Sequence, residues 1–132
     1  GDMNLTLRPL RGRILISYFK KFERHRTIFN YMASPTWKNT YSLSPGQINQ
    51  LEEAEDKMES MEITAAEKIL LSMIKSDPNC IPALNVLGHL NGRYLSDFEI
   101  AIEFYDKVLT LEPENAWARD ERRRFRRYLD YD

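Results

Sequence analysis

The sequence is poor in the residues that most often carry chemistry or covalent cross-links. Its 132 residues include one cysteine (Cys80), two histidines (His25 and His89) and five glycines. A single cysteine excludes an internal disulfide and a cysteine-rich zinc site, and neither histidine has a partner at metal-ligand spacing. Five scattered glycines cannot build a phosphate-binding loop. We therefore expect no enzymatic activity, no catalytic residues, no cofactor and no metal.

Long apolar runs are also lacking. No stretch of about 18 apolar residues occurs, so the sequence predicts no transmembrane helix. Ile14–Ile16 is too short to be the apolar core of a signal peptide. With one cysteine we expect an intracellular, reducing setting, most simply the cytoplasm. Residues 3–44 are basic, rich in hydroxyls and nearly free of acids, which is also typical of a mitochondrial transit peptide.

Charge is divided unevenly along the chain. The formal net charge is −1, but residues 1–44 carry eight Lys or Arg against two acids, a net +6. The remaining residues carry eleven bases against eighteen acids, a net −7. Such opposite segments either attract each other or serve different partners.

The most regular stretch is residues 77–115, which reads as two antiparallel helices bracketed by Pro78 and Pro113. Close approach of the two helices is predicted at Gly88 and Ala101, because glycine inside a helix is unfavourable without a close neighbour. Gly92 is expected to end the first helix. The first helix carries Leu84, Leu87, Gly88 and Leu90, and the second carries Phe98, Ala101, Ile102, Tyr105, Val108 and Leu109 at helical spacing.

A second helical pair precedes it, over Gln47–Met61 and Ile63–Ser76. Ser44 is predicted to cap the first of these helices, with Pro45 at its first position. Its apolar face is Leu51, Ala54, Met58 and Met61. Five apolar residues of the other helix recur 35 residues later: Ile63, Ala66, Leu70, Met73 and Ile74 match Phe98, Ala101, Tyr105, Val108 and Leu109.

On these residues the chain resembles the tetratricopeptide repeats, helix–turn–helix units of about 34 residues. The first pair is degenerate, because Glu53-Ala54-Glu55 stands where the leucine–glycine signature is expected. The resemblance implies an all-α fold of stacked antiparallel helical hairpins, with repeats at about 45–78 and 79–113 and a capping helix at 114–131. The residues expected to define the fold are Ala66, Pro78, Leu84, Leu87, Gly88, Ala101, Tyr105 and Pro113.

Residues 1–44 are interpreted as a basic N-terminal helix and a connector. The helix, residues 10–32, has an apolar stripe of Leu15, Tyr18, Phe19, Phe22, Phe29 and Met32. A short strand at Arg13–Tyr18 is the alternative. We expect the helix to pack on the repeats; a membrane-surface helix and a nucleic-acid contact are the other interpretations, and nucleic acid is not favoured.

The last helix, Ala116–Tyr131, has a thin apolar face and many arginines. We interpret it as a solvated capping helix, with contact to an anion or an acidic partner as the alternative. Its apolar residues are Trp117, Phe125, Tyr128 and Leu129, and its basic patch is Arg122–Arg124, Arg126 and Arg127. The acidic cluster Glu52, Glu53, Glu55, Asp56 and Glu59 is likewise read as a solvated helix face.

The resemblance also implies where a partner would bind, because the first helix of each pair lines a concave face. The candidate groove residues are Asn49, Glu52, Asp56 and Glu59, then Asn85, His89 and Arg93, and on the last helix Trp117, Asp120, Arg124 and Tyr128. Where one subfamily clamps the C-terminal carboxylate of heat-shock chaperones, this chain has Glu52, Asp56, Val86, Trp117 and Glu121, so that binding is not expected.

We therefore expect a non-catalytic scaffold that binds a partner protein or peptide. The alternative is a peripheral membrane or assembly adaptor that uses the basic N-terminal helix. Two repeats are fewer than the three that usually make a stable stack, so the flanking helices, or a second copy of the chain, are expected to complete the core.

Overall fold

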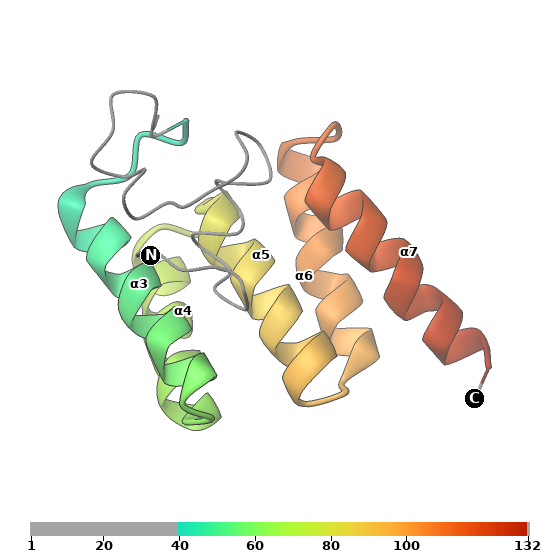
Figure 1. Ribbon diagram of the computed structural model, residues 1–132. Coiled ribbons are helices and arrows are strands. Elements are labelled where there is room, and N and C mark those ends of the chain that lie inside the picture. Colours follow the sequence, from blue (N-terminus) through green and yellow to red (C-terminus); the bar gives the residue numbers. More distant parts are fainter. Residues whose placement is uncertain (1–39, 132) are drawn as a thin grey trace, which may run out of the picture. The chain divides into compact units, whose positions relative to one another are not determined.

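The computed structural model describes residues 40–131, and every regular element within them is helical (Figure 1). This confirms the predicted all-α class for the described residues. The predicted N-terminal helix and most of its connector lie outside them. The chain divides into two compact units, residues 1–66 and 67–132, with the boundary inside α4. The elements are α3 (Pro45–Glu59), α4 (Ile63–Ser76), α5 (Ile81–His89), the π-helical turn η1 (Leu90–Tyr94), α6 (Phe98–Leu111) and α7 (Ala116–Asp130).

In the first unit, α3 begins at the predicted cap. The Ser44 Oγ accepts a hydrogen bond from the Gln47 amide at 3.1 Å, and the Ser44 amide donates to the Gln47 side chain at 2.9 Å. Pro45 occupies the first turn, where its missing N–H has no helical partner to lose. Both halves of a capping box are therefore present.

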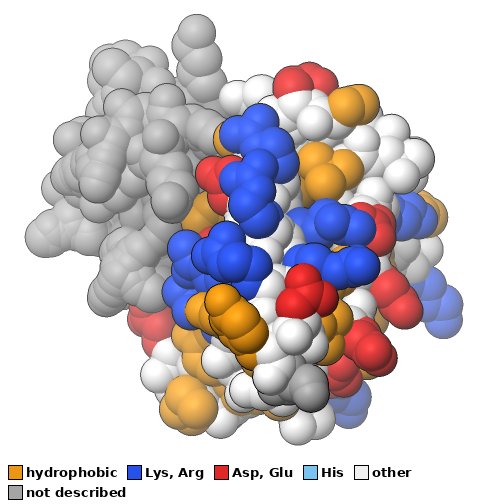
Figure 2. All heavy atoms as spheres, turned by 90° about the vertical axis from the view of Figure 1, so that its right-hand side faces the viewer, with side chains coloured by type: hydrophobic (Ala, Val, Ile, Leu, Met, Phe, Trp, Pro, Cys, Tyr) orange, Lys and Arg blue, Asp and Glu red, His pale blue; other side chains and the backbone are white. Residues whose placement is uncertain are grey.

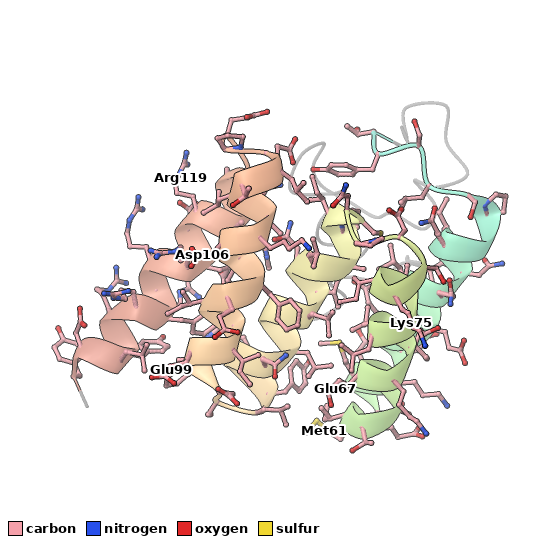
Figure 3. The ribbon with its side chains drawn as sticks, turned by 180° about the vertical axis from the view of Figure 1, so that it is seen from behind. Met61, Glu67, Lys75, Glu99, Asp106 and Arg119 are labelled. Atoms are coloured by element: carbon pink, nitrogen blue, oxygen red, sulfur yellow. The ribbon has the colours of Figure 1, made fainter. Side chains whose placement is uncertain are left out.

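The predicted apolar face of α3 is confirmed for Leu51, Ala54 and Met58, which are buried. It is wrong for Met61, which is 67 % exposed. The helix ends at Glu59, and Met61 adopts a positive φ of 63° in the turn that follows, so its side chain projects outward (Figure 3). In that turn the Glu62 amide donates to the Lys57 carbonyl at 2.7 Å.

The predicted 35-residue recurrence holds for burial. Ala66, Leu70 and Met73 of α4 are buried, and so are their counterparts Ala101, Tyr105 and Val108 of α6. The turns after the two helices also match. The Cys80 amide donates to Asp77 O at 3.0 Å, and 35 residues later the Asn115 amide donates to Glu112 O, also at 3.0 Å. Pro78 and Pro113 are exposed within these turns.

In the second unit α5, α6 and α7 lie side by side, with α6 in contact with both of its neighbours (Figure 1). The ring of Tyr105 stacks on Phe125, with centroids 6.2 Å apart and planes at 7°. Phe98 stacks on Phe125 from α6 as well, at 5.6 Å. The core of the unit consists of Leu84, Ala101, Ile102, Tyr105, Val108, Ala118 and Phe125.

Two glycines let these aromatic rings approach the backbone. A Cβ added to Gly88 would lie 2.5 Å from Tyr105 Cζ, which confirms that a neighbour lies very close to Gly88. A Cβ added to Gly92 would overlap the ring of Phe125. The expectation that Gly92 ends the helix is wrong, because the helical backbone continues to Tyr94 and Gly92 instead serves as a contact surface.

The continuation after α5 is a π turn rather than α-helix. The Leu95 amide donates to Leu90 O at 3.2 Å, five residues back. The buried Asn91 supports the turn, because its side-chain amide donates to Leu87 O at 2.9 Å. Its own carbonyl accepts from the Asp97 amide at 2.8 Å, just before α6 begins.

Candidate functional site

The predicted groove residues fall on both units, and each unit is described separately. Asn49, Glu52 and Asp56 lie on α3 in the first unit. In the second unit, Asn85 and His89 lie on α5, Arg93 on η1 and Arg124 on α7. Asn85 differs from the prediction, since it is 1 % exposed and buried like the rest of α5 from Pro82 to Gly88. It is an interior residue and not an exposed groove position.

His89 is the centre of the part that the structure brings together. Its ring meets Tyr94 edge to face at 5.7 Å and Trp117 at 6.0 Å. Burial, and then the positive charges of Arg93 and Arg124, lower the pKa of His89 to about 3. The imidazole is therefore neutral at physiological pH, with one nitrogen as donor and the other as acceptor. Its Nδ1 is buried and has no hydrogen-bond partner among the described residues.

Glu121 of α7 is also buried, with only 7 % of its surface exposed, although its side chain is a carboxylate. Its Oε2 lies 3.7 Å from Arg124 Nη1, while within the described residues its Oε1 has no hydrogen-bond partner. Glu121 also acts on Tyr105, whose pKa is raised well above its usual value by burial and then by this carboxylate. The Trp117 side chain acts on the pKa of Tyr105 in the opposite direction.

We call His89, Arg93, Trp117, Glu121 and Arg124 the polar cluster. The burial of Glu121 was not predicted, yet a signal existed. Glu121 stands 35 residues after Val86, which is a buried apolar position of α5. The repeat spacing therefore places a carboxylate at a position of the helix that faces inward, and Arg124 one turn later compensates its charge.

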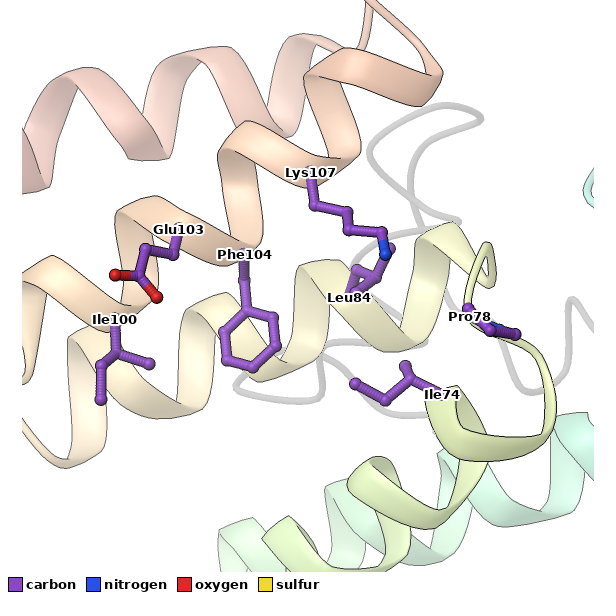
Figure 4. A pocket seen from close by; sticks show the side chains of 7 residues that line it. All are labelled: Ile74, Pro78, Leu84, Ile100, Glu103, Phe104 and Lys107. Carbon is purple, nitrogen blue, oxygen red and sulfur yellow. The ribbon is translucent and has the colours of Figure 1, made fainter.

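A second feature is an apolar hollow of about 360 Å³ in the second unit (Figure 4). Phe104 of α6 points toward α5 there, and the charged side chains of Glu103 and Lys107 lie at its edge. Its lining residues are Ile74, Pro78, Leu84, Ile100, Glu103, Phe104 and Lys107. This hollow was not predicted. Its size and lining suit an apolar side chain, and it holds no histidine, cysteine or serine.

The acidic residues of α3 form a less uniform surface than predicted. Glu55 is 1 % exposed, so the description of the whole cluster as a solvated face is wrong for this residue. Partial burial, and then the charge of Asp56, raise the pKa of Glu52 to about 7. Among residues 40–131, no group of three or more His, Cys, Asp or Glu side chains could hold a metal ion. No helix in the same range is long and apolar enough to cross a membrane.

Comparison with known proteins adds no family or homologue. A scan against protein-family models, a search of curated proteins and a search of solved structures each found no match.

Proposed function

We propose that this chain is a non-catalytic interaction module of the tetratricopeptide type, which binds a segment of a partner protein at the polar cluster. Two features support the type. The buried positions and the turn hydrogen bonds recur at a spacing of 35 residues, close to the 34 of that family. The π turn at Leu90–Tyr94 lies inside this interval. It holds one residue more than an α-helical turn would, which equals the difference between 35 and 34.

The observation that carries the binding proposal is the pair of unsatisfied buried atoms, His89 Nδ1 and Glu121 Oε1, neither of which has a partner within the described residues. A buried polar atom without a partner costs about 1–3 kcal/mol, so folded proteins rarely keep such atoms without a use. Arg93 and Arg124 act on His89, and Arg124 also pairs with Glu121. The cluster thus combines acceptors and donors in a small space.

A polypeptide segment fits this combination. Its carbonyl groups can accept from the exposed Arg93. Its N–H groups can donate to the Glu121 carboxylate and to His89 Nδ1 once the side chains that bury these atoms move aside. Trp117 supplies an aromatic surface beside them, of the kind that often contributes much of the binding energy at protein interfaces. No acid–base pair or activated nucleophile accompanies these groups, so binding and not turnover is the activity that they support.

The experiment is affinity capture from an extract of the source organism, followed by mass spectrometry, with matched variants as bait. Arg93→Glu reverses an exposed charge in the polar cluster, and Lys68→Glu reverses an exposed charge on α4 as the control. We expect a partner that the wild type and Lys68→Glu both retain and that Arg93→Glu loses. Equal capture by both variants would contradict binding at this cluster.

A further inference from the structure

The 35-residue spacing relates α7 to α5 and exposes a contrast between their faces. Ala83, Val86 and Leu90 are buried, and so are the residues 35 positions later, Ala118, Glu121 and Phe125. On the other face the two segments differ completely, since five buried positions of α5 and η1 are matched by five arginines of α7. The pairs are Leu84 and Arg119, Leu87 and Arg122, Gly88 and Arg123, Asn91 and Arg126, and Gly92 and Arg127.

On α5 and η1 this face is where the following helices pack. Gly88 meets the ring of Tyr105 from α6, and Gly92 meets the ring of Phe125 from α7. The same face of α7 is therefore placed like a helix-docking surface, but it is lined with positively charged arginine side chains. We call Arg119, Arg122, Arg123, Arg126 and Arg127 the arginine face. Figure 2, which views the α7 side of the molecule, shows Lys and Arg side chains gathered there.

The charges of this face are only partly compensated. Arg122 pairs with Asp106 of α6, and Arg119 and Arg123 share the single carboxylate of Asp120, at 3.4 and 3.6 Å. Asp130 continues the same stripe, one turn after Arg126 and Arg127. Arg126 and Arg127 are exposed and have no ion pair among the described residues. An apolar helix would have to bury these guanidinium groups unpaired, which is costly.

We propose that the arginine face docks an acidic amphipathic helix of a partner protein, laid along α7 as α6 lies along α5. Glutamate or aspartate residues three and four positions apart on that helix would lie opposite the arginines, which are themselves spaced three and four apart. Guanidinium groups bind carboxylates in a two-pronged geometry that fixes orientation. The proposal rests on the proposed function, to which it adds a second surface and the chemistry of its partner.

A protein segment fits better than a nucleic acid. Residues 67–132 carry ten Lys or Arg against twelve Asp or Glu, so the unit as a whole is negative. A nucleic-acid-binding domain usually has a net positive charge that attracts the phosphate backbone from a distance. Here the positive charge is confined to one helix face, which suits a short acidic segment that meets only this face.

The test measures fluorescence anisotropy of a labelled synthetic peptide on the full chain. The peptide has about four helical turns, with glutamates along one face and alanines elsewhere, and a scrambled peptide of the same composition serves as the sequence control. One variant replaces Arg123, Arg126 and Arg127 by Gln. The matched variant replaces Lys68, Lys75 and Lys107 by Gln, three exposed cations of α4 and α6. We expect the arginine variant to bind the peptide at least about tenfold more weakly and the lysine variant to bind it like wild type.

Three results would overturn the proposal. Equal weakening in both variants, or equal binding of the scrambled peptide, would mean unspecific attraction. If single-stranded RNA or phosphatidylserine vesicles displaced the labelled peptide more strongly than the same peptide without label does, the face would be assigned to a phosphate partner. A dimer seen by light scattering that is lost in the arginine variant would assign it to a second copy of the chain. The Arg93→Glu variant should bind the peptide normally, so failure here and failure at the polar cluster are distinguishable.

Discussion

Replacing Gly88 by alanine tests the packing on which the second unit depends. The added Cβ would lie 2.5 Å from Tyr105 Cζ and 2.6 Å from Cε1, distances at which one of the groups must move. The ring has little room to do so, because it is fully buried and stacks on Phe125. We therefore expect Gly88→Ala to destabilise the protein although alanine is the better helix former.

The magnitude follows from two opposing terms. Overpacking a filled core costs about 1–3 kcal/mol, whereas exchanging glycine for alanine inside a helix stabilises by about 0.5–1 kcal/mol. Because the added Cβ would lie so close to the ring, the overpacking cost should fall in the upper part of its range, and the expected net loss in the free energy of unfolding is about 1–2 kcal/mol. Urea denaturation followed by circular dichroism measures it directly, provided that the slope against denaturant concentration stays unchanged.

Two further variants make this measurement decisive. Gly46→Ala is the control, because its nearest neighbour beyond the adjacent residues is Ser44 Oγ at 3.8 Å, and we expect no loss there. Tyr105→Leu removes the ring, so the cost of Gly88→Ala should shrink in that background. A Gly88→Ala protein as stable as wild type, or an unchanged cost without the ring, would refute the packing described for α5 and α6.

Ala101→Leu should lower the free energy of unfolding by about 1–3 kcal/mol, since Ala101 is fully buried. Cys80→Ser should change it by less than about 1 kcal/mol, because serine at the N-cap of α5 can accept an amide hydrogen bond. Urea denaturation that ranks the two variants in reverse would mean that the helical register is wrong. The neutral His89 contributes stability above its unfolded pKa of 6.5, and this contribution is lost as the pH falls from 6.5 toward the folded pKa of about 3. Its NMR resonances should therefore not titrate between about pH 5 and 8, and a midpoint near 6.5 would contradict its burial. Asn115→Ala should lower the free energy of unfolding by about 1–2 kcal/mol, because Asn115 is buried, accepts a hydrogen bond from the Ala118 amide and donates one to Glu112. Ser44→Ala should cost less in the same assay, because Ser44 is an exposed cap. The opposite order would count against this account of the two caps.

The sequence predicted α4 and α6 well because their apolar residues follow helical periodicity. α4 begins and ends at Ile63 and Ser76 as predicted, and the buried positions of α6 are those of the predicted stripe. Periodicity reports which face of a helix turns inward, and that face recurs at the same spacing in both pairs. The close contact at Gly88 was predictable for the same reason, although its partner, the ring of Tyr105, was not named.

The features that were missed are those without a periodic signal. Nothing in the sequence of residues 90–94 distinguishes a π turn from a helix end, so the sequence does not reveal that the helical backbone continues past Gly92. Glu55 and Glu121 are buried although acids usually mark exposed faces. The apolar hollow arises from residues of α4, α5 and α6 and from the turn after α4, so no single stretch announces it. The resemblance to tetratricopeptide repeats implies a groove position for Asn85, but every residue of α5 from Pro82 to Gly88 is buried.

The π turn at Leu90–Tyr94 has a consequence for how this chain tolerates changes in length. An α-helix turns by about 100° per residue, so an inserted or deleted residue normally rotates every later side chain of that helix onto another face. A π turn takes up one additional residue locally, and here it lies where α5 gives way to the loop before α6. We expect the deletion of one residue there to convert the π turn into an α turn while Leu84, Leu87 and Gly88, which precede it, keep their neighbours. Natural insertions and deletions in such a chain should accumulate at this turn and be rejected within α6.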